Sequence, residues 1–407
     1  MSEHHNLNVV VAAAFTTPVN VVDAHHHIQS RRLLLQYLSE NQFFGLIPSS
    51  ISNLNSLTKL SLQYNKLSGR IPYKIDKLKS LTNLLLTSNR ITGSIPHSIG
   101  KLSQLEYLSL NINELIGPIP SSIGQLASLQ VQFLVHLLRL FRILDLSCNP
   151  LSLGKIPSWM SKLNLSWLML AKTGLKGELP SWLSSLPLGY LDLSSNELTG
   201  RFPTWIGNMS DLWYLNISYN KFYSTIPKEF KNMLLLTDLD LHSNNFSGPL
   251  DFIFDKNVDG PLGHYNTIDV SRNKFTGPID KNVGNKLAMN TISSLILSNN
   301  PLGGRIPKSI GNLTQMRLLE MVRDKLSGTI PEEISNADTL RIIKLSRNYL
   351  TGRVPKMVIN LKWLEKFEVL RNKLSGEIPA HKANFPASAF FGNPGLCGLP
   401  LPACKQV

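Results

Sequence analysis

Leucines and other aliphatic residues recur along most of this chain at fixed spacings, with polar positions between them. The segments that begin at Leu57, Leu81 and Leu105 superimpose without a gap at a spacing of 24 residues. The same frame returns at Leu188, Leu212, Ile292, Met316 and Leu340, and with altered lengths at Phe141, Leu165, Leu236, Tyr265 and Leu364. The pattern therefore predicts roughly thirteen tandem repeats that stack on one another, because no single repeat can bury its own apolar edge.

Each frame reads LxxLxLxxNxLxGxIPxxIxxL. The alternating leucines predict a short strand with one face inward and the other in solvent, and neighbouring strands should stack in parallel. The asparagine lies where the chain turns inward, so its buried amide should bond to backbone groups of adjacent turns. Glycine and Ile-Pro then predict a turn and an extended return to the core. This asparagine is Asn65, Asn89, Asn113, Asn196, Asn220, Asn300, Asn348 or Asn372, replaced once by Thr173 and once by Asp324.

The frames divide the chain into an unassigned segment, 1–37, a repeat array, 38–379, and a closing segment, 380–407. Twelve residues at 129–140 fit no frame, and two interpretations stay open: an apolar helical turn on the convex side, or a sequence-level accident such as a retained intron. A second expansion, 251–264, is rich in polar residues and glycine, which predicts a surface loop.

The LxGxIP element is the mark of the plant-specific leucine-rich repeats, and the chain resembles ectodomains of plant leucine-rich-repeat receptor-like kinases and receptor-like proteins from about Leu38 to Cys404. The resemblance implies an α/β repeat solenoid, a right-handed superhelix with parallel β-strands on its concave face and irregular or 3-10 segments on its convex face. The closing FPASAFFGNPGLCGLPLPAC resembles the family's C-terminal cap, in which the pair Cys397 and Cys404 seals the last turn. The family's N-terminal cap has its own Cys pair and a tryptophan, and nothing before Leu57 contains either residue.

Composition narrows the candidate chemistry. The net charge of +14 suits anionic partners, but the basic residues are scattered and no reading motif is visible, so we expect no nucleic acid partner. No apolar stretch is long enough to span a bilayer, and the apolar run 9–15 makes a poor signal peptide. Kinase motifs are absent, and the adjacent His25, His26 and His27 favour a solvated tail over a metal site. We therefore expect no catalysis, cofactor or metal.

Aromatic residues occupy equivalent positions in successive frames. The position just before the second leucine of the frame is Trp167, Tyr190 and Tyr214 in three successive frames, and Trp213 and Tyr219 flank it. Exposed aromatic residues in a contiguous patch favour binding. The alternative is lateral packing between turns.

Charged residues form two further columns. The position between the strand leucines is largely acidic and includes Asp145, Asp192, Asp240 and Asp269. The position before the asparagine is basic in the late frames, with Arg323, Arg347 and Arg371, and Lys344 lies nearby. In peptide receptors of the resembled family, late-repeat arginines hold a peptide's terminal carboxylate, which suits a bidentate guanidinium, although the family's paired arginines on one strand are not reproduced here. Alternatively, these arginines only solvate the face.

The residues predicted to bind a partner are Trp167, Tyr190, Asp192, Trp213, Tyr214, Tyr219, Asp240, Arg323, Lys344, Arg347 and Arg371. Glycosylation sequons, which fit secretion, occur at Asn164, Asn208, Asn216, Asn245 and Asn312.

The resemblance implies an extracellular or cell-surface module that binds a peptide or protein ligand, with a co-receptor kinase as a further possible partner, in signalling or defence. The alternatives are a soluble cell-wall inhibitor of microbial polysaccharide-degrading enzymes, similar to polygalacturonase inhibitors, and the product of a truncated receptor gene.

Overall fold

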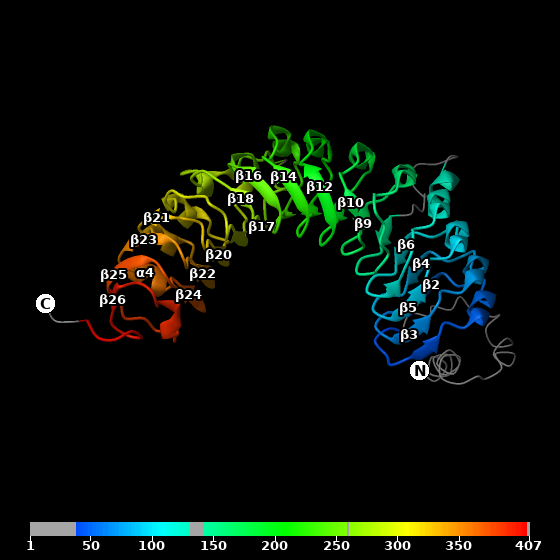
Figure 1. Ribbon diagram of the computed structural model, residues 1–407, viewed down its shortest axis with the longest axis horizontal. Coiled ribbons are helices and arrows are strands. Elements are labelled where there is room, and N and C mark those ends of the chain that lie inside the picture. The colour runs from blue at the N-terminus through cyan, green and yellow to red at the C-terminus, as the bar shows by residue number, and fades with distance from the viewer. Residues whose placement is uncertain (1–37, 131–141, 259, 405–407) are drawn as a thin grey trace. The chain divides into compact units, whose positions relative to one another are not determined.

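A computed structural model describes residues 38–130, 142–258 and 260–404. The segment 1–37, with its histidine triplet, and nearly all of the insertion 129–140 lie outside the described residues. The chain divides into two compact units, residues 1–198 and 199–407. In each unit the strands of a long parallel sheet lie on one side and short helices lie on the opposite side (Figure 1).

Each of the thirteen sequence frames contributes one strand to a parallel sheet. In the first unit these strands are β2 (Lys59–Ser61), β4 (Asn83–Leu85), β6 (Tyr107–Ser109), β8 (Ile143–Asp145), β9 (Trp167–Met169) and β11 (Tyr190–Asp192). In the second they are β13 (Tyr214–Asn216), β15 (Asp238–Asp240), β17 (Thr267–Asp269), β19 (Ser294–Ile296), β20 (Leu318–Glu320), β22 (Ile342–Lys344) and β24 (Lys366–Glu368).

The register of these sheets places equivalent residues of successive frames side by side. Leu60 pairs with Leu84 and Leu84 with Leu108 in the first unit, and Leu319 pairs with Ile343 in the second. These middle residues are buried, whereas the first and third residues of most strands are partly exposed. We call the solvent side of the long sheet in each unit its strand face.

After most of these strands the chain forms a second short strand and then a helical turn. The second strands of the first unit are β1 (Phe44–Leu46), β3 (Lys66–Gly69), β5 (Arg90–Gly93), β7 (Glu114–Leu115), β10 (Lys176–Gly177) and the start of β12 (Glu197–Arg201). The second unit has the rest of β12, β14 (Lys221–Ser224), β16 (Asn245–Gly248), β18 (Lys274–Phe275), β21 (Ser327–Gly328), β23 (Tyr349–Gly352), β25 (Lys373–Glu377) and β26 (Gly395–Cys397).

The helical turns begin after the proline of Ile-Pro in most frames, because proline fixes the extended entry and has no N–H to lose. Those of the first unit are η2 (Ser49–Asn53), η3 (Tyr73–Lys77), η4 (His97–Lys101), η5 (Ser121–Gln130), η6 (Ser158–Lys162) and η7 (Ser181–Ser185). Those of the second are η8 (Thr204–Asn208), η9 (Lys228–Asn232), α3 (Asp251–Phe254), η10 (Val283–Asn285), η11 (Leu287–Met289), η12 (Lys308–Asn312), η13 (Glu332–Asn336), α4 (Lys356–Ile359) and η14 (Ala387–Ala389).

The frame asparagines form the expected hydrogen-bonded ladder. Asn89 Nδ2 donates to the carbonyl of Leu62 in the preceding turn at 2.9 Å and to that of Leu86 in its own turn at 3.1 Å. Its Oδ1 accepts the backbone N–H of Leu67 at 3.0 Å. One buried amide thus satisfies groups on two turns, which ties neighbouring repeats together. The same role belongs to Asn149, Asn244, Asn273 and Asn393, which lie in frames of altered length or in the closing segment.

Asp324 replaces the ladder asparagine with a fully buried carboxyl group. Its Oδ1 accepts the backbone N–H of Asn300 at 2.8 Å, whereas its Oδ2 is buried without a hydrogen-bond partner. Burial raises the pKa of Asp324 to about 8, because a carboxylate that leaves water without compensating donors is unfavourable. An asparagine Nδ2 at this position would donate a hydrogen bond. The ionised Oδ2 of Asp324 has no hydrogen to donate.

The expansion 251–264 is only partly the surface loop that its composition predicts. Gly260, Pro261 and Leu262 are exposed, but Ile253 and Phe254 of α3 are buried in the core. The prediction of a surface loop was wrong for these residues, because a short helix with a buried apolar side lies among the polar residues.

Lys256, in the same expansion, is buried as well, with 4% of its surface exposed. Its ammonium donates to the carbonyls of Leu234, Asn257 and Gly263 and lies 4.9 Å from the centre of the Tyr265 ring. Desolvation lowers the pKa of Lys256 to about 8. The long methylene stem and the three carbonyl acceptors together allow this lysine to be buried within the expansion 251–264.

Candidate functional site

Aromatic side chains on the strand face of the first unit pack against each other and remain accessible. Trp167 opens β9 and is paired in register with Tyr190, which opens β11. Their rings are stacked with centroids 5.3 Å apart, and 37% of Trp167 is exposed. The rings therefore pack laterally between turns and still present an exposed surface, so their role in binding stays a prediction.

The second unit carries a separate aromatic group on its strand face. Trp213 is 37% exposed and contacts Tyr214 edge to face, with centroids 6.0 Å apart. Tyr219 is half exposed and its ring meets that of His242 edge to face at 4.4 Å. These rings offer amphipathic contact area, which favours binding of a peptide or protein surface.

The acidic column is held by a repeated local hydrogen bond. Each aspartate that ends its strand accepts the backbone N–H two residues later: Asp145 from Ser147, Asp192 from Ser194, Asp240 from His242 and Asp269 from Ser271, at 2.9–3.0 Å. This bond orients the carboxylates at the end of the strand face. Burial raises the pKa of Asp145 and of Asp269 despite this bond.

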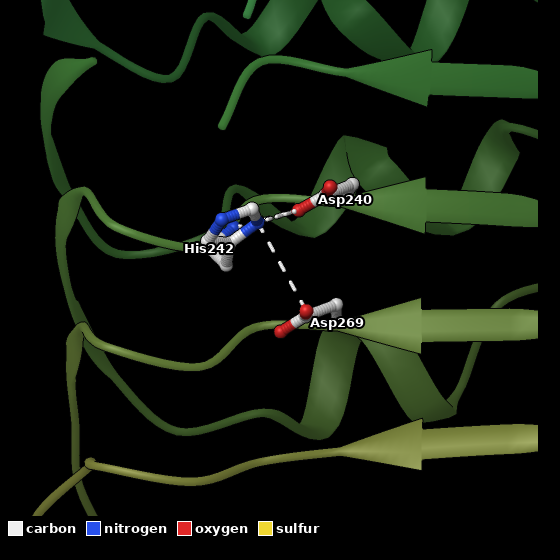
Figure 2. A group of neighbouring side chains, drawn as sticks. All are labelled: Asp240, His242 and Asp269. Carbon is white, nitrogen blue, oxygen red and sulfur yellow. Dashed lines mark hydrogen bonds and ion pairs between the residues drawn. The ribbon is translucent and has the colours of Figure 1, made fainter. Parts of the chain in front are cut away.

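His242 lies between two of these aspartates (Figure 2). Its Nδ1 is 2.6 Å from Asp240 Oδ1 and 3.9 Å from Asp269 Oδ2. The hydrogen bond to Asp240 raises the pKa of the His242 imidazole, against a smaller opposing effect of desolvation. The three side chains come from adjacent turns that carry β15 and β17, and their ligand-type atoms lie within 4.8 Å of one another.

Three arginines of the late frames form a pocket with a volume of about 340 Å³. Arg323, Arg347 and Arg371 all lie in the turn that follows a strand, with φ between 56° and 61°, so this left-handed position repeats in the three frames. In the described part of the chain none of their guanidinium groups has a hydrogen-bond or ion-pair partner. The positive charges of Arg323 and Arg371 lower the pKa of Arg347. The pocket lining is Arg323, Lys325, Arg347, Asn348, Tyr349 and Arg371.

Lys344, also predicted to bind a partner, lies on β22 outside this pocket. Its ammonium is 2.7 Å from Glu320 Oε2 on the neighbouring strand β20, and Glu320 also accepts a hydrogen bond from Ser298. Lys344 is therefore already neutralised within the sheet, unlike the three arginines.

Two kinds of predicted modification site can also be placed. Cys397 and Cys404 form a disulfide, and Cys148 is an exposed free cysteine. Of the sequon asparagines, Asn208, Asn245 and Asn312 are exposed, whereas Asn164 and Asn216 are partly buried. Asn216 ends β13 on the strand face and accepts hydrogen bonds from Ser218, so a glycan there would cover part of that face.

Sequence reasoning missed four residues of these clusters: His242 beside the acidic column, and Lys325, Asn348 and Tyr349 in the arginine pocket. The signal for His242 was present, because it lies two residues after Asp240, on the same turn. Tyr349 is half exposed, and Lys373 lies over its ring at 5.4 Å. In two turns the pocket also includes the residue after the ladder position, Lys325 after Asp324 and Tyr349 after Asn348.

Comparison with known proteins agrees with this architecture. Two family models described as leucine-rich repeats match the chain, one at residues 187–246 and the other at 56–78, 80–102, 104–126, 141–163 and 291–313. Receptor-like protein 39 of Arabidopsis thaliana is 30% identical over 116 residues, and receptor-like protein 36 of the same plant is 32% identical over 109 residues. These matches cover 28% and 27% of this chain but only 12% and 14% of the relatives.

Solved structures of plant receptors align over most of the chain. The crystal structure of a TDR receptor superimposes with a TM-score of 0.68 at 26% identity, covering 89% of this chain and 62% of that one. The Arabidopsis receptor kinase HAESA, in complex with the peptide hormone IDA and the co-receptor SERK1, gives 0.65 at 29% identity, covering 89% and 66%. The plant peptide hormone receptor RGFR1, in complex with RGF2, gives 0.64 at 25% identity, covering 88% and 62%. No helix among the described residues is long and apolar enough to cross a membrane.

Proposed function

We propose that this chain, a leucine-rich-repeat solenoid similar to plant receptor ectodomains, is a non-catalytic extracellular module that binds a peptide through its strand face. The observation that carries the proposal is the pocket of Arg323, Arg347 and Arg371, three cations without a partner in the described structure. The ligand group we assign to this pocket is a carboxylate.

The arginine pocket is electrostatically unsatisfied. Three like charges on successive turns repel one another, as the lowered pKa of Arg347 indicates. An anion placed among them would relieve this repulsion and accept charge-assisted hydrogen bonds from a rigid fork of donors. Carboxylates match the guanidinium geometry in a bidentate manner, which makes them preferred ligands of arginine.

The surrounding surface supports a peptide over a small anion. Tyr349 provides an exposed ring at the pocket, and on the same unit Trp213, Tyr214 and Tyr219 offer further aromatic contact area. A peptide can engage an anion pocket and aromatic anchors together, which adds apolar burial to the ionic contact. The similar HAESA and RGFR1 structures are complexes with the peptide hormone IDA and with RGF2, and the HAESA complex also contains a co-receptor. We therefore extend the proposal to a peptide signal and a co-receptor kinase at the cell surface.

A peptide selection tests the proposal. Random peptides with free C-terminal carboxylates are selected on the wild-type chain, and their affinity is measured again on a variant with Arg323→Ala, Arg347→Ala and Arg371→Ala. We expect a loss on the order of 100-fold, because two or three charge-assisted hydrogen bonds disappear. Converting the carboxylates of the peptide to amides should weaken binding to the wild type to a similar extent.

The matched control removes the same net charge elsewhere, through Arg201→Ala, Arg305→Ala and Arg353→Ala, all exposed and outside the pocket. This control should retain at least about a third of the affinity, since screened surface charges contribute little. Equal losses in the two triple variants, or peptides that bind the pocket variant as tightly as the wild type, would contradict the proposal.

A further inference from the structure

We propose that Asp240, His242 and Asp269 form a binding site for a divalent transition metal ion, zinc being the best match, on the strand face of the second unit. This inference goes beyond the proposed peptide binding and does not depend on it. It stands on the geometry of three side chains that come from two adjacent turns and converge on one point (Figure 2).

The donor set suits a borderline metal ion. One imidazole nitrogen and two carboxylate oxygens are ligands that zinc accepts, and the imidazole argues against magnesium or calcium, which prefer oxygen alone. A zinc ion at its usual distance of about 2.0–2.2 Å from each ligand requires ligand atoms about 3.5 Å apart. The three ligand-type atoms lie within 4.8 Å of one another, so small side-chain rotations would bring them to this spacing.

The ligands are already oriented by bonds that a metal would leave intact. Asp240 Oδ1 and Asp269 Oδ1 each accept a backbone N–H, from His242 and Ser271. Asp269 Oδ2 lies 3.9 Å from His242 Nδ1. The Tyr219 ring meets the imidazole edge to face at 4.4 Å and restricts its rotation. Such supporting contacts fix the direction of metal ligands and lower the entropy lost on binding.

The site has access to solvent and room for further ligands. The side chains of Asp240, His242 and Asp269 are 27%, 19% and 21% exposed, so an ion could enter from the strand face. Three protein ligands leave at least one coordination position of a tetrahedral zinc open. That position would face the surface to which we assign the peptide, where a water molecule or a ligand carboxylate could complete the shell.

Charge also favours a cation at this point. Two carboxylates lie 2.6 and 3.9 Å from His242 Nδ1, whereas the positive charge of Arg272 acts in the opposite direction. A divalent ion bound here would offset both carboxylates and contact all three side chains at once.

Titration of the full chain with zinc chloride alone, followed by calorimetry at neutral pH, tests the site. We expect the wild type to bind one equivalent of zinc more than His242→Ala. The Asp269→Asn variant should lower the affinity of that equivalent at least tenfold, since one charged ligand becomes neutral. The matched control is His264→Ala, which removes a partly exposed histidine outside the cluster and should keep the wild-type stoichiometry. His25, His26 and His27 are present in every variant, so any zinc they bind cancels in the comparison.

A second readout does not rely on affinity. Zinc-edge anomalous scattering from crystals grown with zinc should give a peak within about 2.3 Å of His242 Nδ1, and thermal unfolding without metal should confirm that each variant is folded. The proposal is overturned if His242→Ala binds as many zinc ions as the wild type. It is equally overturned if Asp269→Asn leaves the affinity unchanged, because the aspartates would then serve only to hold the protonated imidazole.

Discussion

Replacing Asn348 with alanine should lower the free energy of unfolding by roughly 3–5 kcal/mol, because several buried backbone groups lose their partner at once. Asn348 Oδ1 accepts the N–H groups of Asp324 and Leu326 at 2.9 and 3.1 Å. Its Nδ2 donates to the carbonyls of Met321 and Leu345 at 2.7 and 3.0 Å. The asparagine is only 5% exposed, so water can replace few of these lost partners. Urea unfolding followed by circular dichroism measures the effect.

The control for this prediction is Asn336→Ala, the same substitution at an exposed position of η13 in the same region. It should change the free energy of unfolding by no more than about 0.5 kcal/mol, as is usual for surface positions. If Asn348→Ala lay within about 1 kcal/mol of this control, the ladder would not be the main tie between turns.

Replacing Asp324 with asparagine should stabilise the protein increasingly as the pH rises. The pKa of Asp324 is raised from 3.8 to about 8 in the folded chain, so the folded state binds this proton more tightly than the unfolded state. The stability that the proton contributes is complete below about pH 4 and is lost as the pH rises towards 8. At about 1.4 kcal/mol per unit the full effect is on the order of 5 kcal/mol. Asparagine cannot ionise and also supplies the amide donor of the ladder.

The measurement is the urea midpoint of the wild type and of Asp324→Asn between pH 4 and pH 9. We expect similar midpoints at the acidic end and a widening gap up to about pH 8, after which the gap stays constant. Asp338→Asn, at an exposed position of the following turn, should follow the wild type throughout. A gap that does not change with pH would show that Asp324 is ionised in the folded protein.

Much of the fold was accessible from the sequence because its rules are local and repeated. The Leu-x-Leu alternation fixes which strand residues are buried, and stacking of like frames sets the register, so thirteen frames predicted the strands of the long sheet in both units. The hydrogen bonding of the ladder asparagine could also be predicted, since a polar residue at a fixed place between leucines needs buried partners. Irregular frames were harder: in 251–264 the polar residues concealed Ile253, Phe254 and Lys256, all buried.

The residues of a candidate site could be predicted only where they occupy the same position in successive frames. Comparing frames sideways brought Arg323, Arg347 and Arg371 together, because each occupies the same left-handed position of its frame. Tyr349 and His242 join their clusters from other positions, and their placement depends on how each turn leaves the strand. The sequence also does not show whether a basic side chain has an ion-pair partner. Lys344 and the arginines look alike in sequence, yet of these only Lys344 has Glu320 beside it.

Binding of a peptide to the strand face is the central claim, and hydrogen exchange with a peptide selected on the wild-type chain tests it most directly. The account predicts slower amide exchange in β20, β22 and β24 and in the turns that carry Arg323, Arg347 and Arg371. Exchange in η13 and α4, the helical turns of the frames that carry β20 and β22, should stay unchanged. Protection confined to these helical turns, with the strands and the arginine turns unaffected, would contradict it.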